Sequence, residues 1–476
     1  MAHFLMRKLL ALVATLLSVS LIVFLALELN IEDVAINVLG PYSAADQRAA
    51  WLVEHGYNQP FVWRYLVWLK DFASGDWGTS VYFRESVIKL LLPNLGQTLT
   101  LAGLALLVMV PVALTLGVLA GIRQGSALDR LVSFLSIVTT SIPDFASAVF
   151  VSAIFVFWLN WLPGVSSMSE GFSAVQLVLP LMVLCLFGIG YLARITRASM
   201  VEVMQAPYIR TARLKGASTS RIVLRHALRN VLIAPVTVIM LYIPWLLSNV
   251  IVVEVFFAYK GFGSLLYTAS LNHDVYLIEA CAMVSAVVVG ITKIFSDLAY
   301  TGSTAHHPAQ SRRRCPMNLL HSFKHPLALL GLLLVGGWVL IALFAPWIAP
   351  HDPLESFTPL LTPMTAGDNG QSFLLGTDMI GRDILSRLIW GTRTVLFWSI
   401  LATLTAFAVG IAMGLCAGYF NGWVDSLLSY VADTVLSFPV LVLYIVIIIA
   451  LGASALNILI AVTFTSAPAI SGSCAP

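Results

Sequence analysis

The sequence predicts an all-α, polytopic helical membrane protein, and three observations support this prediction. The chain has 476 residues, of which 59% are hydrophobic and 10% charged, and its mean hydropathy is +0.91. Several stretches reach the roughly 20 apolar residues that a helix needs to cross a bilayer. Basic residues mark one side of the membrane, at the start of the chain and after the second, fourth and sixth apolar stretches, as is typical of cytoplasmic loops. A soluble domain could not bury this much apolar surface, and the sequence lacks the alternating segments of an outer-membrane barrel.

Residues 1–300 are expected to form one domain with six spans and a cytoplasmic N-terminus. Arg7 and Lys8 precede the first apolar run, which is too long for the core of a signal peptide and is therefore interpreted as a retained span. The tryptophan-rich loop 30–96 is placed outside, with segments lying at the membrane–water boundary. We expect spans near residues 9–29, 97–121, 131–159, 176–192, 232–258 and 277–300.

A second, truncated domain is expected at residues 325–470, after a polar linker at residues 301–324. The linker contains Pro308 and Pro316 and has no hydrophobic period. Spans are expected near residues 326–349, 394–418 and 427–450, and a last apolar run at 453–464 is short for a span. The second domain is therefore a partial copy with three to four spans.

The two domains contain a sequence repeat. Three glycines, Gly117, Gly121 and Gly125, have the same mutual spacing as Gly414, Gly418 and Gly422. After a one-residue gap a further set matches in order: Asp129, Leu131, Ser133, Phe134, Ser141 and Pro143 against Asp425, Leu427, Ser429, Tyr430, Ser437 and Pro439. Both copies enter the membrane from the same side, so the repeat is parallel. Parallel repeats imply an axis along the membrane normal with a pathway at their interface.

The stretch from Tyr191 to Pro235 is the most strongly basic part of the chain. It carries eight Lys and Arg residues and one acid, Glu202. Pro207 suits the first position of a helix and Gly216 the position just past its end. Ser218 is then placed to cap a second helix, on which Arg221, Arg225 and Arg229 recur every four residues and share one face. We interpret this loop as a docking platform on the cytoplasmic surface; the alternative is an ordinary loop that is basic for topological reasons alone.

The motifs of several chemistries are missing from the sequence. No Gly-x4-Gly-Lys-Ser/Thr phosphate loop and no Gly-x-Ser-x-Gly occur. The five cysteines form no CxxC pair, which argues against a zinc site or a disulfide framework. The net charge of +3 gives no reason to expect a nucleic-acid partner. We therefore expect a protein without ATPase or covalent catalytic activity, cofactor or metal.

A few polar features within the spans are candidates for a transport pathway. Acidic groups inside a membrane are functional candidates by default, although an interhelical hydrogen bond or an interfacial position would also explain them. Pro143 and Pro439 are expected to kink equivalent helices. The pathway candidates are Pro143, Asp144, Asp433 and Pro439, with Glu254 as a further acid near the outer end of span five.

At this point the residues resemble a known family. The sequence YIRTARLKGASTSRIVLRHALRN at residues 208–230 resembles the ATPase-docking loop of ABC importer permeases, in particular the dipeptide/oligopeptide (peptide/nickel) branch. The general Glu-Ala-Ala motif is represented by Arg210-Thr211-Ala212, and the motif glycine corresponds to Gly216; the later Ile-x-Leu-Pro element is not matched. The resemblance assigns the docking loop to residues 193–230, with Pro207, Arg210, Thr211, Ala212, Lys215, Gly216, Arg221 and Arg225 as its site residues.

The second domain resembles the partner permease of the same branch. Its segment LGTDMIGRDILSRLIWGTRT at residues 375–394 is similar to the outside segment of that subunit. The resemblance ends before a second docking loop is reached. We therefore interpret the chain as a whole first permease fused to a truncated second one, with Met317 as an original start.

The resemblance implies a mechanism and a set of partners. ABC ATPase subunits bind the docking loops, a second permease subunit completes the path, and an extracytoplasmic substrate-binding protein delivers the substrate. The protein then resides in the bacterial inner membrane, in contact with lipid, and imports di- or oligopeptides, nickel chelates or glutathione. Two alternatives stay open: an ion- or proton-coupled carrier that uses Asp144, Glu254 and Asp433, and a non-functional fused remnant.

Overall fold

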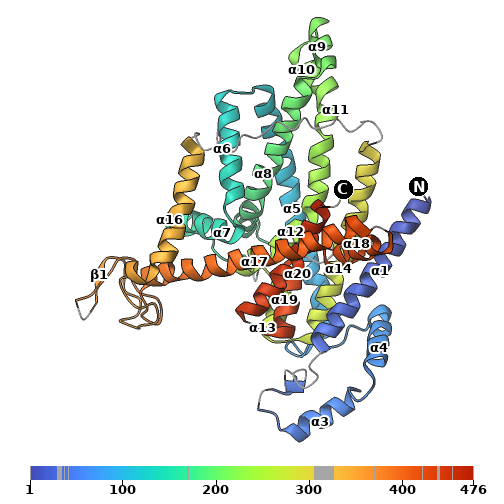
Figure 1. Cartoon of the computed structure of the whole chain (residues 1–476), viewed down its shortest axis with the longest axis vertical. Coiled ribbons are helices and arrows are strands. Elements are labelled where there is room, and N and C mark those ends of the chain that lie inside the picture. The colour runs from blue at the N-terminus through green and yellow to red at the C-terminus, as the bar shows by residue number, and fades with distance from the viewer. Residues whose placement is uncertain are drawn as a thin grey trace. The chain divides into compact units, whose positions relative to one another are not determined.

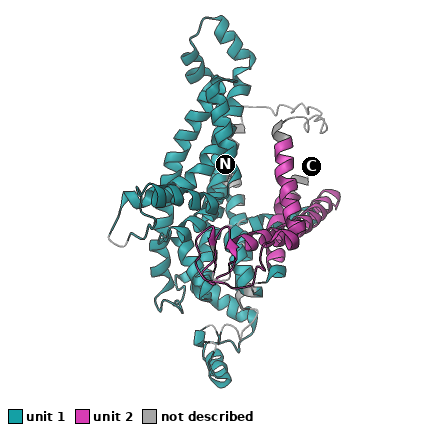
Figure 2. Ribbon diagram, turned by 90° about the vertical axis from the view of Figure 1, so that its left-hand side faces the viewer, with its two compact units in different colours: residues 1–307, 423–457 teal, residues 308–422, 458–476 magenta. Residues whose placement is uncertain are grey.

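The computed structural model describes most of the chain. The described residues are 2–28, 35–36, 38–40, 42–168, 171–304, 326–367, 370–420, 422–436, 440–452 and 454–474. Pro439 and residues 305–324 of the expected linker lie outside them. Contacts divide the chain into two units: unit 1 is Met1–His307 with Trp423–Asn457, and unit 2 is Pro308–Gly422 with Ile458–Pro476 (Figure 2). The expected division at residues 300 and 325 stays a prediction.

Helices dominate unit 1, as the composition predicts. Six helices among the described residues of the chain are long and apolar enough to cross a membrane, or up to nine if each bent pair is one span. The polytopic helical class is thereby confirmed. The elements of unit 1 are α1 (Ala2–Glu28), α3 (Ala45–Glu54), α4 (Phe61–Ser74), α5 (Val87–Ile122), α6 (Ala127–Ser141), α7 (Asp144–Ser152), η1 (Ala153–Trp158), α8 (Ala174–Met204), α9 (Pro207–Leu214), α10 (Thr219–Arg221), η2 (Ile222–Ala227), α11 (Leu228–Val231), α12 (Ile233–Phe256), α13 (Phe262–Leu271), α14 (Val275–Thr304), α18 (Gly422–Leu436) and α19 (Val440–Leu451).

Close helix packing forms the centre of unit 1. Helix α5 packs along α8 through Gly117 and Gly121. A Cβ atom on Gly117 would lie 2.5 Å from the Cβ of Thr196, and one on Gly121 would lie 2.6 Å from the Cβ of Met200. Only glycine permits this approach, which is how small residues act at interfaces between membrane helices. Packing thus accounts for these two glycines of the repeat.

The third span, expected at residues 131–159 with a kink at Pro143, is broken at that proline. Helix α6 ends at Ser141, α7 begins at Asp144, and the two segments are bent by 107°. Pro143 sits at the N-cap of α7 and Ile142 before it is extended (φ −95°, ψ 124°). Both observations follow from proline, which disfavours the helical conformation in the preceding residue. The Ser141 hydroxyl donates to the Ile137 carbonyl at 2.7 Å.

Other helix boundaries also differ from expectation. Helix α8 continues to Met204, so Arg194 and Arg197 lie on a span and not in the loop after it. Helix α13 is absent from the sequence-based expectation. Its first turn receives the buried Glu254, whose carboxylate accepts hydrogen bonds from the backbone N–H groups of Gly263 (2.7 Å) and Ser264 (3.0 Å) and from the Thr98 hydroxyl. Glu254 therefore caps a helix, which is the interhelical alternative considered for it.

The ends of unit 1 carry different structures. In Figure 1, α9 and α10 lie beyond the upper ends of the long helices α8 and α12, whereas α3 and α4 lie beyond the opposite ends. The loop after α4 is fixed to the start of α14, because the buried Asp274 carboxylate accepts from the Ser80 hydroxyl and from the Tyr82 N–H at 3.1 Å. The predicted platform and the tryptophan-rich loop are thus at opposite ends of the spans.

Unit 2 consists of a span, a compact loop and a second long helix. Its elements are α16 (Pro326–Ile348), the antiparallel strands β1 (Thr365–Ala366) and β2 (Ser372–Phe373), α17 (Ile384–Phe420) and α20 (Ala455–Cys474). Helix α17 begins ten residues before the expected span, and α20 replaces the short apolar run at its end. The sequence pattern did not predict the strands.

The two copies of the repeat have the same sequence of helices. Helix α5 has 36 residues and α6 has 15, whereas α17 has 37 and α18 has 15. A glycine with positive φ stands at each connection, Gly125 (+80°) and Gly422 (+64°). The axes of α18 and α19 differ by 91°, like the break between α6 and α7. The two copies thus share a long helix, a short helix and a sharp break in the same order, and that the copies run parallel stays a prediction.

Candidate functional site

The platform at residues 193–230 is a small folded unit at the end of α8 and α12. Pro207 occupies the first position of α9, as predicted. Gly216 has φ +77° and follows the helix end; its N–H donates to the Arg213 carbonyl at 3.0 Å, and the next N–H, of Ala217, donates to the Ala212 carbonyl at 3.2 Å. This pair of bonds is the Schellman arrangement, which requires a left-handed residue at this place.

The second half of the platform differs in detail from the prediction. Ser218 is at the N-cap of α10, but its side chain makes no capping bond within the described residues. The helix that follows is interrupted by the π-helical turn η2. The predicted basic face is present, because Arg221, Arg225 and Arg229 are all accessible to solvent. Leu224 lies off the arginine face and yet is 70% exposed.

An apolar core of its own holds the platform together. It contains Met200 from α8, Ile209 from α9, and the buried side chains Ile222, Val223, Ala227 and Val231 from the second half. The Asn230 amide also donates to the Tyr208 hydroxyl at 2.7 Å, which ties α9 to α11. A topological loop needs no core, whereas a surface that receives force does, because packing contacts transmit displacement.

The outer surface of the platform combines apolar and basic groups. Leu214 is 81% exposed and Leu224 70%, and the basic side chains of the same segments, among them Arg213 and Lys215, are exposed as well. Arg210, Thr211, Lys215 and Gly216 are exposed as well, while Ala212 is half-buried against the core. Exposed apolar side chains together with exposed basic ones are the composition of a protein-binding surface. The structure thus brings the eight predicted docking residues together in one folded element.

The sequence analysis did not predict an ion pair between α6 and α8, near the platform. Arg197 on α8 donates through Nε and Nη2 to the buried Asp129 carboxylate on α6, the second bond at 2.8 Å. The Gly125 N–H also donates to Asp129 at 2.8 Å. In the sequence, Asp129 stands out only as a repeat position and Arg197 only as one basic residue among many. Their separation of 68 positions gives no indication that the two side chains meet.

The pathway candidates are distributed over different places. Asp144 is half-buried in the first turn of α7, directly after the break, and α7 packs against α8 and α12. The Tyr242 hydroxyl on α12 is buried without a hydrogen-bond partner among the described residues. Asp433 pairs with Lys293 of α14 at 2.7 Å. Asp144 and Asp433 are thus separate features.

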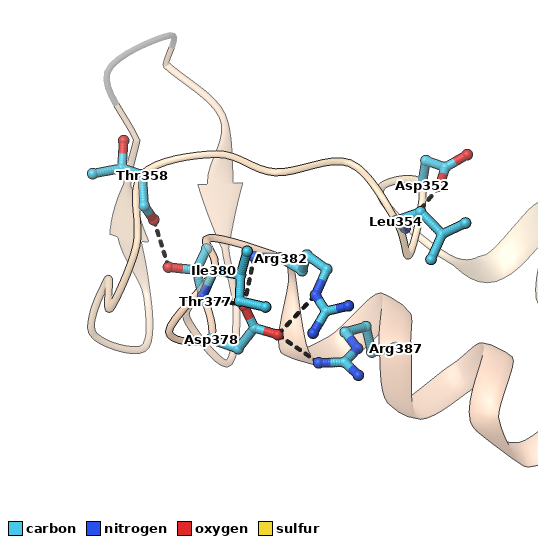
Figure 3. Close-up of polar contacts among 8 residues, drawn as sticks. All are labelled: Asp352, Leu354, Thr358, Thr377, Asp378, Ile380, Arg382 and Arg387. Carbon is cyan, nitrogen blue, oxygen red and sulfur yellow. Dashed lines mark hydrogen bonds and ion pairs between the residues drawn. The ribbon is translucent and has the colours of Figure 1, made fainter. Parts of the chain in front are cut away.

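The loop before α17 contains a tight polar network (Figure 3). The Asp378 carboxylate accepts from the backbone N–H groups of Ile380 and Arg382, both at 2.9 Å, and from the side chains of Arg382 (3.0 Å) and Arg387 (2.5 Å). The backbone bond from Arg382 is the main reason why the pKa of Asp378 is lowered to about 2. The Thr377 hydroxyl donates to the Thr358 carbonyl at 2.6 Å.

This network holds together the loop at residues 375–394, which the sequence predicted to resemble the outside segment of a partner permease. Gly376 (φ +78°) and Gly381 (φ +85°) supply the left-handed turns that bring its bonding groups together. The Leu375–Thr394 motif therefore specifies a rigid loop fixed to the start of α17. No group of three or more His, Cys, Asp or Glu side chains that could hold a metal occurs among the described residues.

Comparisons with known proteins identify the family. Residues 113–303 match the family described as binding-protein-dependent transport system inner membrane component. Residues 322–364 match the N-terminal transmembrane domain of oligopeptide transport permease C. The first match contains the whole platform, and the second begins at the start of the second domain.

Several relatives align with this chain over nearly their whole length. A probable peptide ABC transporter permease of Sinorhizobium fredii is 32% identical over 305 residues, which cover 63% of this chain and 97% of that protein. The oligopeptide transport system permease protein AppB of Bacillus subtilis is 29% identical over 307 residues, 63% of this chain and 97% of the relative. The dipeptide transport system permease protein DppB of Alkalihalophilus pseudofirmus is 30% identical over 326 residues, 63% and 98%. This chain belongs to the family of inner-membrane permease components of ABC transport systems.

Proposed function

We propose that the chain is the translocation subunit of an ATP-driven, binding-protein-dependent importer of di- or oligopeptides. The observation that carries this proposal is the platform, a folded element with its own core and an exposed apolar and basic surface. In this proposal the platform faces the cytoplasm and the N-terminus lies on the same side. The peptide class is inferred from the names of the relatives.

The platform acts as a lever between a separate ATPase and the spans. An ATPase subunit docks against α9, with Leu214 and Leu224 as apolar contacts and Arg210, Lys215, Arg221 and Arg225 around them. Ile209 on α9 and Met200 on α8 belong to the same core, which also includes residues directly before α12. A displacement of α9 therefore moves both α8 and α12. The Arg197–Asp129 pair extends this connection to α6.

The pathway runs past the broken third span. By the helical rise of 1.5 Å per residue, Asp144 lies about 22 Å along the axis from the start of α6, within the thickness of a bilayer core. Broken helices in corresponding positions of two repeats are the best sequence pointer to a binding site in transporters. Asp144 supplies an acceptor for a peptide ammonium group, and Tyr242 supplies a hydroxyl from α12, which packs against α7. Pro143 positions Asp144 by ending α6.

The second domain is the remnant of the partner permease. Its copy of the repeat contains the α17–α18–α19 series, and residues 322–364 match the partner's first segment. The proposed fusion leaves one docking platform in this chain. A second docking loop is then supplied by another chain.

Transport driven by ATP tests this proposal. The chain is reconstituted into liposomes with its ATPase and binding protein, and uptake of a labelled dipeptide is measured with ATP on the platform side. Uptake should require ATP and continue when ionophores collapse proton and sodium gradients. Uptake that persists without ATP and stops with the ionophores would establish the carrier alternative instead. A chain that binds no ATPase would be the fused remnant.

A further inference from the structure

Helices α18 and α19 belong by contact to the first permease, although they come from the second copy of the repeat. Unit 1 includes Trp423–Asn457 together with Met1–His307 (Figure 2, teal). The preceding helix α17 belongs to unit 2. The second copy of the repeat is thus divided between the two units.

The contact made by α19 is apolar and fully buried. Helix α19 packs against α1, α12, α13 and α14. Val442, Leu443 and Val446 are at most 1% exposed and lie in the same cluster as Val19 of α1 and Leu266 of α13. A lipid-facing helix would show a gradient of exposure, whereas these side chains are enclosed like a protein core.

Two polar contacts fix the register of α18 on the same surface. The Tyr430 and Ser18 hydroxyl oxygens are 2.7 Å apart. The Lys293 ammonium donates to the Asp433 carboxylate at 2.7 Å, and both side chains of this pair are about half-exposed (45% and 61%). Directional bonds to α1 and α14 indicate one defined docking position and not a general affinity for apolar surface.

The sequence repeat indicates which helices of the first domain are equivalent to α18 and α19. Helices α18 and α19 correspond to α6 and α7, with Tyr430 matching Phe134. Two copies related by an axis along the membrane normal meet through equivalent faces, so that each gives its third span to the other. The outward face of α6 and α7 is apolar and open: Phe134 is 63% exposed, Ile137 55% and Phe145 60%.

We propose that α18 and α19 occupy, within one chain, the place on unit 1 at which the broken third span of a second permease subunit packs. The inference rests on the proposed function for the identity of the partner. The fused segment then completes one half of the pairing surface in cis. An intact second permease would have to displace this segment before it could use the α1 and α14 surface.

A disulfide between Ser18→Cys and Tyr430→Cys tests the contact in the full chain. The five native cysteines are replaced by alanine, and a protease site is inserted between Thr304 and Pro326. After oxidation and cleavage, the two fragments should migrate as one band without reductant and as two bands with it. The control pair Ser18→Cys with Ser429→Cys moves the second thiol about 100° around α18, and it should give severalfold less crosslinked product.

Two outcomes would overturn the proposal. One is crosslinking no stronger than in the control pair; the other is crosslinking only between differently tagged copies of the chain, which would mean that the segment packs in trans. Neither readout involves ATP or uptake, so a failed ATPase interaction would remove the proposed function and leave this contact as it is.

A second measurement follows the cleaved chain without a crosslink. The fragments should co-purify in mild detergent, and Val442→Asp should separate them because it buries a carboxylate in the apolar contact. Asp433→Ala is the matched control, and it should retain the fragments because a half-exposed ion pair contributes little. Equal retention in the Val442→Asp protein would contradict the proposal.

Discussion

Replacement of Gly216 by valine tests the platform as a mechanical element. Gly216 has φ +77°, and a Cβ atom there would meet nothing within 4 Å. The substitution therefore adds backbone strain without a steric clash. A residue with a Cβ in the left-handed region costs roughly 1–2 kcal/mol, more for a β-branched side chain. The Schellman bonds that Gly216 and Ala217 make to the end of α9 bear this strain.

The backbone strain at residue 216 should lower the affinity of the platform for the ATPase by a measurable factor. A cost of about 1–2 kcal/mol lowers the population of the native hinge by about 5- to 30-fold relative to its alternatives. The spans are untouched, so Gly216→Val should insert and purify like the wild type. The apparent affinity for the ATPase, measured by titrating labelled ATPase onto nanodiscs that hold the chain, should fall by a similar factor, and uptake should fall with it.

Gly75→Val provides a matched control for the strain alone. Gly75 has φ +92° and follows the end of α4, and a Cβ atom at this position would likewise meet nothing within 4 Å. It lies at the opposite end of unit 1 from the platform (Figure 1). Its valine variant should bind the ATPase normally. Normal ATPase affinity in Gly216→Val, or an equal loss in Gly75→Val, would refute the reasoning.

Three further predictions concern buried and loop carboxylates. Arg197→Ala should lower the melting temperature in detergent because Asp129 stays buried without its main partner. Adding Asp129→Asn to this variant should restore part of the lost melting temperature. If the losses of the two single variants simply add up in the double variant, the pairing is contradicted. Glu254→Gln should lower the melting temperature because the single amide oxygen cannot accept hydrogen bonds from both Thr98 and the α13 backbone. Lost uptake at an unchanged melting temperature would instead indicate that Glu254 couples transport to an ion or proton gradient. The pKa of Asp378 is lowered to about 2, so its stabilisation of the loop is complete above the ordinary value near 4 and disappears as the pH falls toward 2. The Asp378→Asn protein serves as the reference for the pH dependence of pepsin itself. Cleavage of this loop should be slower in the native chain than in the variant at pH 4 and similar in the two proteins at pH 2. An equal ratio of the two rates at both pH values would oppose this account.

The sequence predicted the parts of the fold that depend on local chemistry. The apolar runs predicted that the chain has many membrane-spanning helices, and Pro207 with Gly216 predicted where α9 begins and ends. The Ser-x-Pro positions of the repeat gave the place of the break at Pro143. These features are encoded by residues close together in the chain, where backbone restrictions and hydropathy act directly.

Tertiary features could not be predicted in the same way. The cap that Glu254 places on α13 joins residues of three helices, and the Arg197–Asp129 pair joins residues far apart in sequence. The extension of α8 to Met204 is stabilised by the platform core, since Met200 belongs to it. Basic residues at a helix end look the same in sequence as basic residues in a loop. Only packing distinguishes the two.

Crosslinking from the tip of α9 tests the central claim most directly. Leu214 is 81% exposed on the outer surface of the platform, so Leu214→Cys presents a thiol where the ATPase is proposed to dock. In inside-out membrane vesicles with the ATPase bound, a short bifunctional thiol reagent should join the two chains, and the yield should change when ATP is added. No crosslink to the ATPase, or labelling of this cysteine only from the extracytoplasmic side, would contradict the account.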